Sequence, residues 1–142
     1  VIDATAGIEV GTVKHYNLLK KHGIPTIIYI NKMDKEYVKF DALLEEIKTK
    51  LGKTAVSFVY PLGHEEEFDG FVNVVTLKAR KYNGTECVDD IIHEDKKAKI
   101  LQLHNVITEQ VALTDEALLE KFFGGETLSM DEIHKGLYSA VL

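Results

Sequence analysis

The side chains best suited to chemistry lie in the tetrapeptide Asn31-Lys32-Met33-Asp34, which directly follows the apolar run of residues 26–30. The ionised carboxylate of Asp34 can accept two neighbouring donors in a charge-assisted bidentate pair. Guanine presents such a pair in its ring N–H and exocyclic amino group, whereas adenine has an acceptor there and would leave the carboxylate unpaired. The spacing therefore predicts guanine recognition by Asp34, with Asn31 bracing the loop and the stem of Lys32 lying along the base.

Two strands and a helix are predicted to position this loop. Residues 1–7 have the pattern of a strand end and a small-residue loop, residues 11–22 that of a helix, and residues 26–30 that of a buried strand. Gly23 suits the left-handed conformation that often ends a helix. Strand, helix and strand within about thirty residues indicate a right-handed parallel crossover. Ligands of open α/β sheets bind where such strands end.

A second helix is expected after the loop, because apolar residues recur there every three or four positions and Gly52 ends the pattern. We expect residues 1–52 to belong to a doubly wound α/β domain with a mostly parallel sheet, whose other strands lie outside this chain. The chain opens on a strand without a methionine, which indicates a piece of a longer protein. The apolar residues of the second helix are Phe40, Leu43, Leu44, Ile47 and Leu51.

Residues 53–142 have a different character and form the second predicted unit, an α+β arrangement. Strands are expected at about 55–88 and helices at about 94–142. Asn83-Gly84 is a strong turn signal between two short strands. The strands are expected to form a hairpin or meander. They are predicted over residues 55–60, 70–77, 80–82 and 86–88.

Three helices are expected in the last third of the chain. The first begins at Glu94, and the second covers residues 115–123 and stops at Gly124. The third begins with a capping box, in which Ser129 and Glu132 satisfy each other's backbone N–H groups. The buried face of the first helix is predicted to contain Ile100, Leu103, Ile107 and Val111, and the hydrophobic staple of the third to contain Leu128 and Ile133.

Charge and composition exclude several classes of protein. The formal net charge of -6 argues against a surface that coats nucleic acid, so no direct DNA binding is expected. The single cysteine, Cys87, excludes an internal disulfide, suits a reducing compartment and is expected to be buried or half-buried. No apolar run approaches the ~18 residues of a membrane span. We expect a cytoplasmic protein without membrane contact.

Two further motifs are rejected as nucleotide-binding elements. Gly52-Lys53-Thr54 resembles the second half of a phosphate-binding P-loop, but residue 47 is Ile instead of Gly, and the triplet follows a helix instead of opening one. Ser139-Ala140 resembles a base-contacting loop but lies inside a helical pattern. The six histidines lack the paired spacing of a metal site, so no metal ligand is predicted.

The chain resembles the GTPase domain of the bacterial translation elongation factor G family, including the insertion subdomain of that factor. The resemblance rests on residues 1–10, 23–25 and 29–34 of the first unit and on residues 61–73, which match the start of the insertion. It extends through the later helices and covers essentially all of the chain. Val10-Gly11-Thr12-Val13 replaces the commoner sequence of the family, and this variant is similar to the elongation factor G-like paralogue branch.

That resemblance implies a partial P-loop GTPase fold with an α+β insertion subdomain. GTP or GDP would be recognised through Asn31, Lys32 and Asp34. The P-loop, switch I and D-x-x-G segments that hold the phosphates, Mg2+ and the attacking water are absent from the sequence. The chain alone is therefore expected not to hydrolyse GTP, and no catalytic residue is predicted in it. In the family, hydrolysis on the ribosome promotes translocation during protein synthesis, and the insertion contacts the acidic stalk protein of the large subunit.

Two alternatives remain open on the sequence alone. The residues after Lys53 carry acidic side chains with interleaved apolar ones, a pattern typical of a solvated face and also of a partner surface. They could form a ribosome-interaction module without nucleotide function. The other alternative is an unrelated α/β nucleotide-binding enzyme in which N-K-x-D is coincidental.

Overall fold

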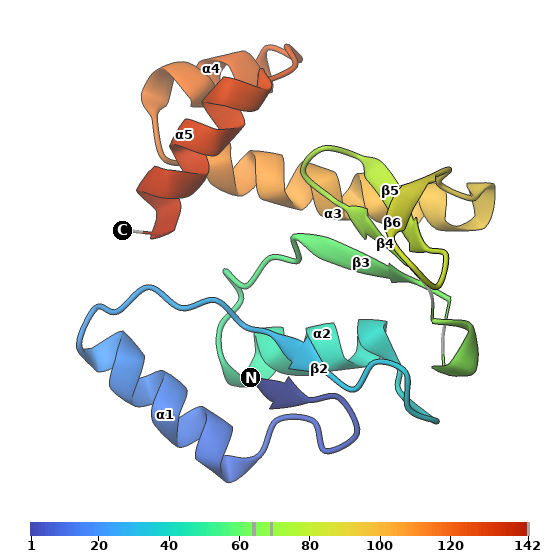
Figure 1. Ribbon diagram of the computed structural model, residues 1–142. Coiled ribbons are helices and arrows are strands. Elements are labelled where there is room, and N and C mark those ends of the chain that lie inside the picture. The colour runs from blue at the N-terminus through green and yellow to red at the C-terminus, as the bar shows by residue number, and fades with distance from the viewer. Residues whose placement is uncertain (64, 69, 142) are drawn as a thin grey trace.

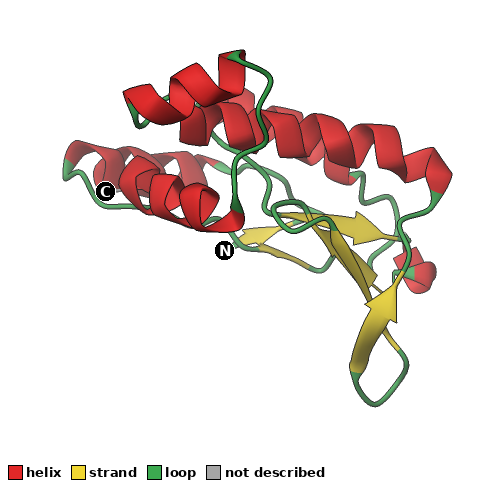
Figure 2. Ribbon diagram, turned by 90° about the horizontal axis from the view of Figure 1, so that it is seen from above, coloured by secondary structure: helices red, strands yellow, loops and turns green. Residues whose placement is uncertain are grey.

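The computed structural model describes residues 1–63, 65–68 and 70–141. It combines a two-stranded parallel sheet with a four-stranded antiparallel sheet and the helices that pack on them (Figure 1). Figure 2 shows that one pair of strands and its connecting loop project away from the helices at one end. Two separate clusters of buried apolar side chains form the core. The chain is therefore a mixed α/β structure, as the sequence predicts.

The N-terminal part contains β1 (Ile2–Asp3), α1 (Val10–Lys21) and β2 (Ile30–Asn31). The two strands are parallel, and Asp3 lies opposite Asn31. The helix ends with Gly23 at φ +63°, whose N–H donates to the Lys20 carbonyl over 3.1 Å. The next N–H, that of Ile24, donates over 3.0 Å to the Leu19 carbonyl, and the two bonds together form a Schellman motif. The predicted helix and its stop signal are confirmed.

The apolar run before the loop differs from the buried strand that the sequence predicts. Regular strand geometry begins only at Ile30, although the Tyr29 carbonyl already accepts the Ile2 N–H over 2.8 Å. Ile28 and Ile30 pack against the smaller apolar cluster, whereas the side chains of Ile27 and Tyr29 are exposed. Successive strand side chains point to opposite faces, and only one face of this strand is covered in the described part of the chain. The prediction of a buried strand over residues 26–30 was therefore wrong.

Helix α2 (Phe40–Lys50) buries side chains on two faces. Leu43 and Ile47 join β1 in the smaller cluster, and Leu44 joins the larger cluster of the second half. Its Asp41 carboxylate accepts the Tyr60 hydroxyl over 3.0 Å and pairs with the Lys99 ammonium at 3.2 Å. Helix α2 is thus the element shared by the two halves of the chain.

The antiparallel sheet is a meander in the order β3-β4-β5-β6, as predicted. Its strand bounds differ from the expected ones, because the first strand begins at Val59 instead of residue 55 and the second strand ends at Asn73 instead of residue 77. The Asn73 side-chain oxygen accepts the N–H groups of Val75 and Thr76 over 3.0 and 2.9 Å, which turns the chain inside the expected strand. A 3-10 turn, η1 (Glu65–Glu67), lies between the first two strands. The strands are β3 (Val59–Leu62), β4 (Gly70–Asn73), β5 (Lys78–Tyr82) and β6 (Cys87–Asp90).

Cys87 begins β6, which is an edge strand of the described sheet. Its side chain is exposed, so the prediction of a buried or half-buried residue was wrong. The strand residues from Cys87 to Asp89 are all exposed, and since successive side chains point to opposite faces, neither face of β6 is covered here in the described part of the chain.

Three helices complete the described chain: α3 (Glu94–Ala112), α4 (Glu116–Phe123) and α5 (Met130–Val141). Asp115 caps α4 by accepting the Ala117 and Leu118 N–H groups. These helices pack with the meander around the larger apolar cluster. The predicted inner face of α3 is confirmed, because four residues are buried: Ile100, Leu103, Ile107 and Val111.

The capping box of α5 is also confirmed. The Ser129 hydroxyl accepts the Glu132 N–H over 3.3 Å, and the Glu132 carboxylate accepts the Ser129 N–H over 2.8 Å. The staple residues Leu128 and Ile133 are both buried. Glu132 also forms an ion pair with Lys121 of α4 at 2.5 Å. Lys121 and the Ser129 hydrogen bonds lower the pKa of Glu132 to about 2.

A first prediction concerns the inner face of α3. Leu103→Ala should lower the free energy of unfolding by about 2–5 kcal/mol, because it removes buried contacts and leaves a cavity. Leu101→Ala is the matched control on the same helix; its side chain is 43% exposed, and the expected change is within about 0.5 kcal/mol. Urea unfolding followed by far-UV circular dichroism measures both. Equal losses in the two variants would contradict the assignment of the buried face.

A second prediction concerns the pH dependence that Glu132 contributes. Its pKa is about 2 in the folded chain, against an ordinary value of 4.5. The carboxylate therefore stabilises the fold fully above pH 4.5 and progressively less as the pH falls toward 2. The difference in unfolding free energy between the wild type and Glu132→Gln should shrink over that interval.

Urea unfolding at several pH values tests this, with Glu116→Gln on the neighbouring helix as the control that should keep the wild-type profile. A difference between wild type and Glu132→Gln that stays constant from pH 6 to pH 2 would show that the carboxylate does not stabilise this cap.

Candidate functional site

The loop Asn31–Asp34 lies at the carboxyl end of the parallel strand pair, next to the end of β1. The register that places Asp3 opposite Asn31 brings residues 3–5 beside the loop. The tetrapeptide thus begins at the last residue of β2, which confirms that it lies at the end of a strand in a parallel pair. Parallel strands present their carboxyl ends at one edge of the sheet, which is where ligands bind in open α/β folds.

Lys32 forms an ion pair across this edge. Its ammonium lies 2.5 Å from the Asp3 carboxylate, which also accepts the Thr5 hydroxyl over 2.6 Å and the Thr5 N–H over 2.9 Å. The hydrogen bond from Lys32, followed by those from Thr5, holds the pKa of Asp3 well below its usual range. The hydrogen bond to Asp3 in turn raises the pKa of Lys32. Lys32 itself adopts a left-handed backbone with φ +61°. Such strained positions in non-glycine residues are enriched at functional sites.

Asp34 presents its carboxylate to solvent. Its side chain is 57% exposed and pairs with the neighbouring Lys35 ammonium at 3.1 Å. The Lys35 hydrogen bond lowers the pKa of Asp34, so the group is ionised at neutral pH. An exposed ion pair of this kind contributes little to stability. The carboxylate is therefore accessible as an acceptor, and within the described residues no buried salt bridge occupies it.

Asn31 lies at the end of β2 and is exposed. Within the described residues its side chain makes no hydrogen bond, and it does not line the hollow that contains Lys32 and Asp34. The structure thus brings together two of the three residues that the sequence singles out.

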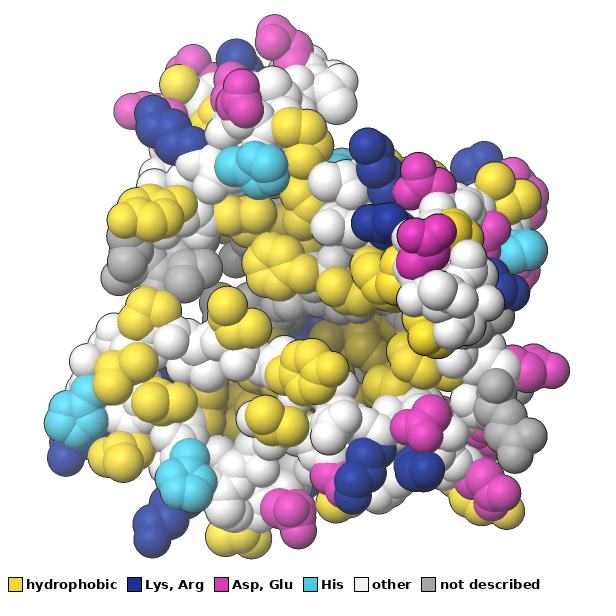
Figure 3. Space-filling view, viewed as in Figure 1, with side chains coloured by type: hydrophobic (Ala, Val, Ile, Leu, Met, Phe, Trp, Pro, Cys, Tyr) yellow, Lys and Arg dark blue, Asp and Glu magenta, His cyan; other side chains and the backbone are white. Residues whose placement is uncertain are grey.

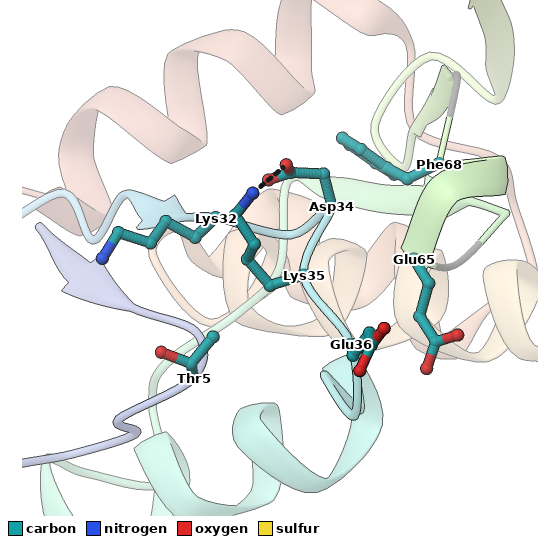
Figure 4. Close-up of a pocket in the computed structure, with 7 residues that line it drawn as sticks. All are labelled: Thr5, Lys32, Asp34, Lys35, Glu36, Glu65 and Phe68. Atoms are coloured by element: carbon teal, nitrogen blue, oxygen red, sulfur yellow. Dashed lines mark ion pairs between the residues drawn. The ribbon is translucent and has the colours of Figure 1, made fainter.

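An open hollow of about 860 Å³ lies beside Asp34 (Figure 4). The loop and the β1 end supply five of its lining residues, and two more come from the segment that includes η1, far along the chain. Three carboxylates and two ammonium groups are among its lining side chains, so it suits a polar ligand. The lining residues are Thr5, Lys32, Asp34, Lys35, Glu36, Glu65 and Phe68.

Sequence reasoning named only Lys32 and Asp34 among the residues that line this hollow, and the contributors that it missed include Asp3, Glu65 and Phe68. The contribution of Asp3 could have been predicted from the parallel crossover, because aligning the two strands places Asp3 opposite Asn31. Glu65 and Phe68 carry no local signal, because they reach the loop only through the packing of the second half of the chain.

The two rejected motifs lie where the sequence analysis expects them. Gly52-Lys53-Thr54 follows α2 in a turn, with the Ala55 N–H donating to the Gly52 carbonyl over 3.1 Å, and it opens no helix. Ser139 lies within α5, where its hydroxyl donates to the Lys135 carbonyl over 3.2 Å. Among the residues that the structure describes, no group of three or more His, Cys, Asp or Glu side chains could hold a metal ion. No helix in the described chain has the length and apolar character needed to cross a bilayer.

Comparison with known proteins identifies relatives over the whole chain. It is 31% identical to an elongation factor G-like protein of Thermotoga maritima over 137 residues, covering 96% of this chain and 20% of that protein. It is 28% identical to elongation factor G of Mycoplasma genitalium over 145 residues, covering 100% of this chain and 21% of that protein. The chain thus spans about a fifth of the length of these relatives. The resemblance to the elongation factor G family is confirmed.

A crystal structure of a protein from Thermus thermophilus superposes with a TM-score of 0.87 and 26% identity, over 99% of this chain and 21% of that one. The family model described as "Elongation factor Tu GTP binding domain" matches residues 1–126. The chain therefore belongs to the elongation factor Tu GTP-binding domain family.

Proposed function

We propose that this chain carries the guanine-recognition loop and the insertion subdomain of a translational GTPase related to elongation factor G. The observation that carries the proposal is the exposed, ionised Asp34 carboxylate at the end of a parallel strand, in a chain of a GTP-binding family. Residues 1–52 would belong to the GTPase core, and residues 53–142 would form the insertion. In the full protein, the core would be a doubly wound P-loop fold.

Asp34 has the chemistry that guanine requires. Its two carboxylate oxygens accept only, and they match the paired donors of the base. The weak, exposed contact to Lys35 would be exchanged for this bidentate pair when the nucleotide binds. Asp34 would therefore determine the choice of base.

Lys32 and Asn31 would assist Asp34. The ion pair with Asp3 restrains the Lys32 ammonium, so its methylene stem is held along the edge of the hollow, where it can cover the face of the base. Asn31, at the strand end, would brace the loop and reach the other edge of the base. Both roles depend on the strand register that places Asp3 beside the loop.

Hydrolysis would require segments other than these residues. The phosphates, Mg2+ and the attacking water would be held by a P-loop, switch I and D-x-x-G segment of the full protein, and the chain alone would be inactive. The full protein would bind and hydrolyse GTP on the ribosome and promote translocation in the cytoplasm. The guanine preference is the part of this function that the present residues determine.

A third prediction tests the role of Asp34 in the full-length protein. Asp34→Asn should weaken GDP binding by roughly a hundredfold or more, because two charge-assisted hydrogen bonds are lost. It should also shift preference toward xanthine nucleotides, whose carbonyl can accept from the new amide. Nucleotide affinities measured by fluorescence titration with GDP and XDP check this.

Glu45→Gln is the control, since Glu45 is an exposed carboxylate on the following helix α2 and does not line the hollow. It should keep the guanine preference. Unchanged GDP-to-XDP selectivity in Asp34→Asn would refute the assignment.

The last three helices favour a second function for the insertion, docking to the acidic stalk protein of the large ribosomal subunit. Phe123 is 78% exposed at the end of α4, although its ring contacts that of Phe122, and Leu113 and Tyr138 are exposed on the neighbouring segments. Exposed aromatic and aliphatic side chains on packed helices are typical of partner surfaces. This role stands independently of nucleotide recognition.

A fourth prediction tests docking on the 142-residue chain. Titration with stalk protein should perturb amide resonances of residues 94–141, and Phe123→Ala should weaken binding by about tenfold. Tyr82→Ala, which removes an exposed aromatic side chain from β5, is the matched control and should bind as the wild type does. An NMR titration without perturbed resonances in these helices would exclude the interaction.

A further inference from the structure

We propose that the segment Glu65–Phe68 of the insertion is part of the nucleotide-recognition site. Glu65 would be a positioning residue for the loop that carries Asp34, and Phe68 would form the apolar wall beside the base. This inference rests on the proposed guanine recognition and adds to it a specificity-determining contribution from the other half of the chain.

Glu65 holds the loop directly. Its carboxylate oxygen Oε1 accepts the backbone N–H of Tyr37 over 3.0 Å, a contact between residues 28 positions apart. Hydrogen bonds to an ionised carboxylate are stronger than those between neutral groups. Tyr37 has a left-handed backbone with φ +64°, a conformation that costs free energy in a non-glycine residue and needs support from its surroundings.

The loop has little support of its own. In the described structure, the backbone between β2 and α2 has one internal hydrogen bond, from the Lys35 N–H to the Lys32 carbonyl over 3.3 Å. The Tyr37 contact lies three residues after Asp34 and ties the loop to the insertion. The position of the Asp34 carboxylate therefore depends on Glu65.

Phe68 supplies the apolar part of the hollow. Its ring extends toward Asp34 in Figure 4, and both residues line the same space. An apolar wall excludes water from one side of the carboxylate, and hydrogen bonds are stronger in a site of lower dielectric constant. Phe68 would thus strengthen the contact between Asp34 and the base.

The charged side chains of the hollow favour binding of the base over binding of the phosphates. Asp34, Glu36 and Glu65 contribute carboxylates, against the ammonium groups of Lys32 and Lys35, and the Lys32 group is already paired with Asp3. Carboxylates attract the donor edge of guanine and repel phosphate oxygens. The hollow therefore suits the base, and the phosphates would lie outside it.

The position of the segment is fixed by the chain itself. Gly63 precedes η1 with φ +74°, and a Cβ at this position would lie 1.9 Å from the Glu67 carbonyl oxygen. Only glycine allows this close approach. The 3-10 turn therefore packs closely against the residue that follows β3, and Glu65 and Phe68 on either side of this contact line the hollow.

The experiment compares variants of the full-length protein by their affinities for GDP and IDP, which lacks the exocyclic amino group that Asp34 would bind. Glu65→Ala and Phe68→Ala should each weaken GDP binding by about tenfold and lower the GDP-to-IDP preference. Glu65→Gln should restore both values, because its amide oxygen still accepts the Tyr37 N–H. Phe68→Leu should likewise retain most of the preference.

Glu67→Ala is the matched control, since Glu67 belongs to the same 3-10 turn but does not line the hollow. Asp34→Asn separates the two proposals. If it leaves selectivity unchanged, the guanine assignment itself fails. If it changes selectivity while Glu65→Ala and Phe68→Ala behave like Glu67→Ala, the role of the insertion segment is overturned.

Amide hydrogen exchange on the 142-residue chain gives a readout that needs no nucleotide. The Tyr37 amide should exchange at least about tenfold faster in Glu65→Ala than in the wild type or Glu65→Gln. Equal exchange rates in the three proteins would overturn the positioning role.

Discussion

Helix α2 must bury apolar side chains on two faces, and the arrangement of the rest of the chain follows from that constraint. Leu43 and Ile47 close the cluster under the parallel strands, whereas Leu44 belongs to the cluster under the meander and the C-terminal helices. Polar contacts support the second face, because Asp41 binds both Tyr60 and Lys99. Burial, followed by the charge of Asp41, raises the pKa of Tyr60 to about 12, so the hydroxyl keeps its proton and donates to the carboxylate across the physiological range.

This shared helix explains how the two halves meet at one hollow. The loop that begins after β2 ends where α2 begins, and β3, which packs on the other face of α2, leads directly into η1. The carboxylate of Asp34 and the side chains of Glu65 and Phe68 therefore line the same space. In contrast to this polar hollow, hydrophobic side chains gather on the surface over α1 and β2 (Figure 3). Ile27 and Tyr29 are among the exposed hydrophobic residues.

Local signals in the sequence predicted much of the helical structure. The inner face of α3, the Schellman stop after α1 and the capping box of α5 each depend on residues within a few positions of one another, so their physics is contained in a short segment. Strand bounds were predicted less well, since Asn73 turns the chain within an apolar stretch that has the composition of a strand. The site was predicted in part. Lys32 and Asp34 carry a recognisable spacing, whereas the contacts of Asp3 and Glu65 span 29 and 28 positions and depend on tertiary packing.

The two outer strands of the meander also determine how the sheet behaves toward other chains. Pro61 lies within β3 and has no N–H to offer a further strand, and its register partner is Phe71 of β4. On the opposite side, β6 carries Asp89 and Asp90, whose charges disfavour the approach of another extended segment. The sheet is therefore protected against growth by edge-to-edge pairing, and self-association into β-rich aggregates is disfavoured on both sides.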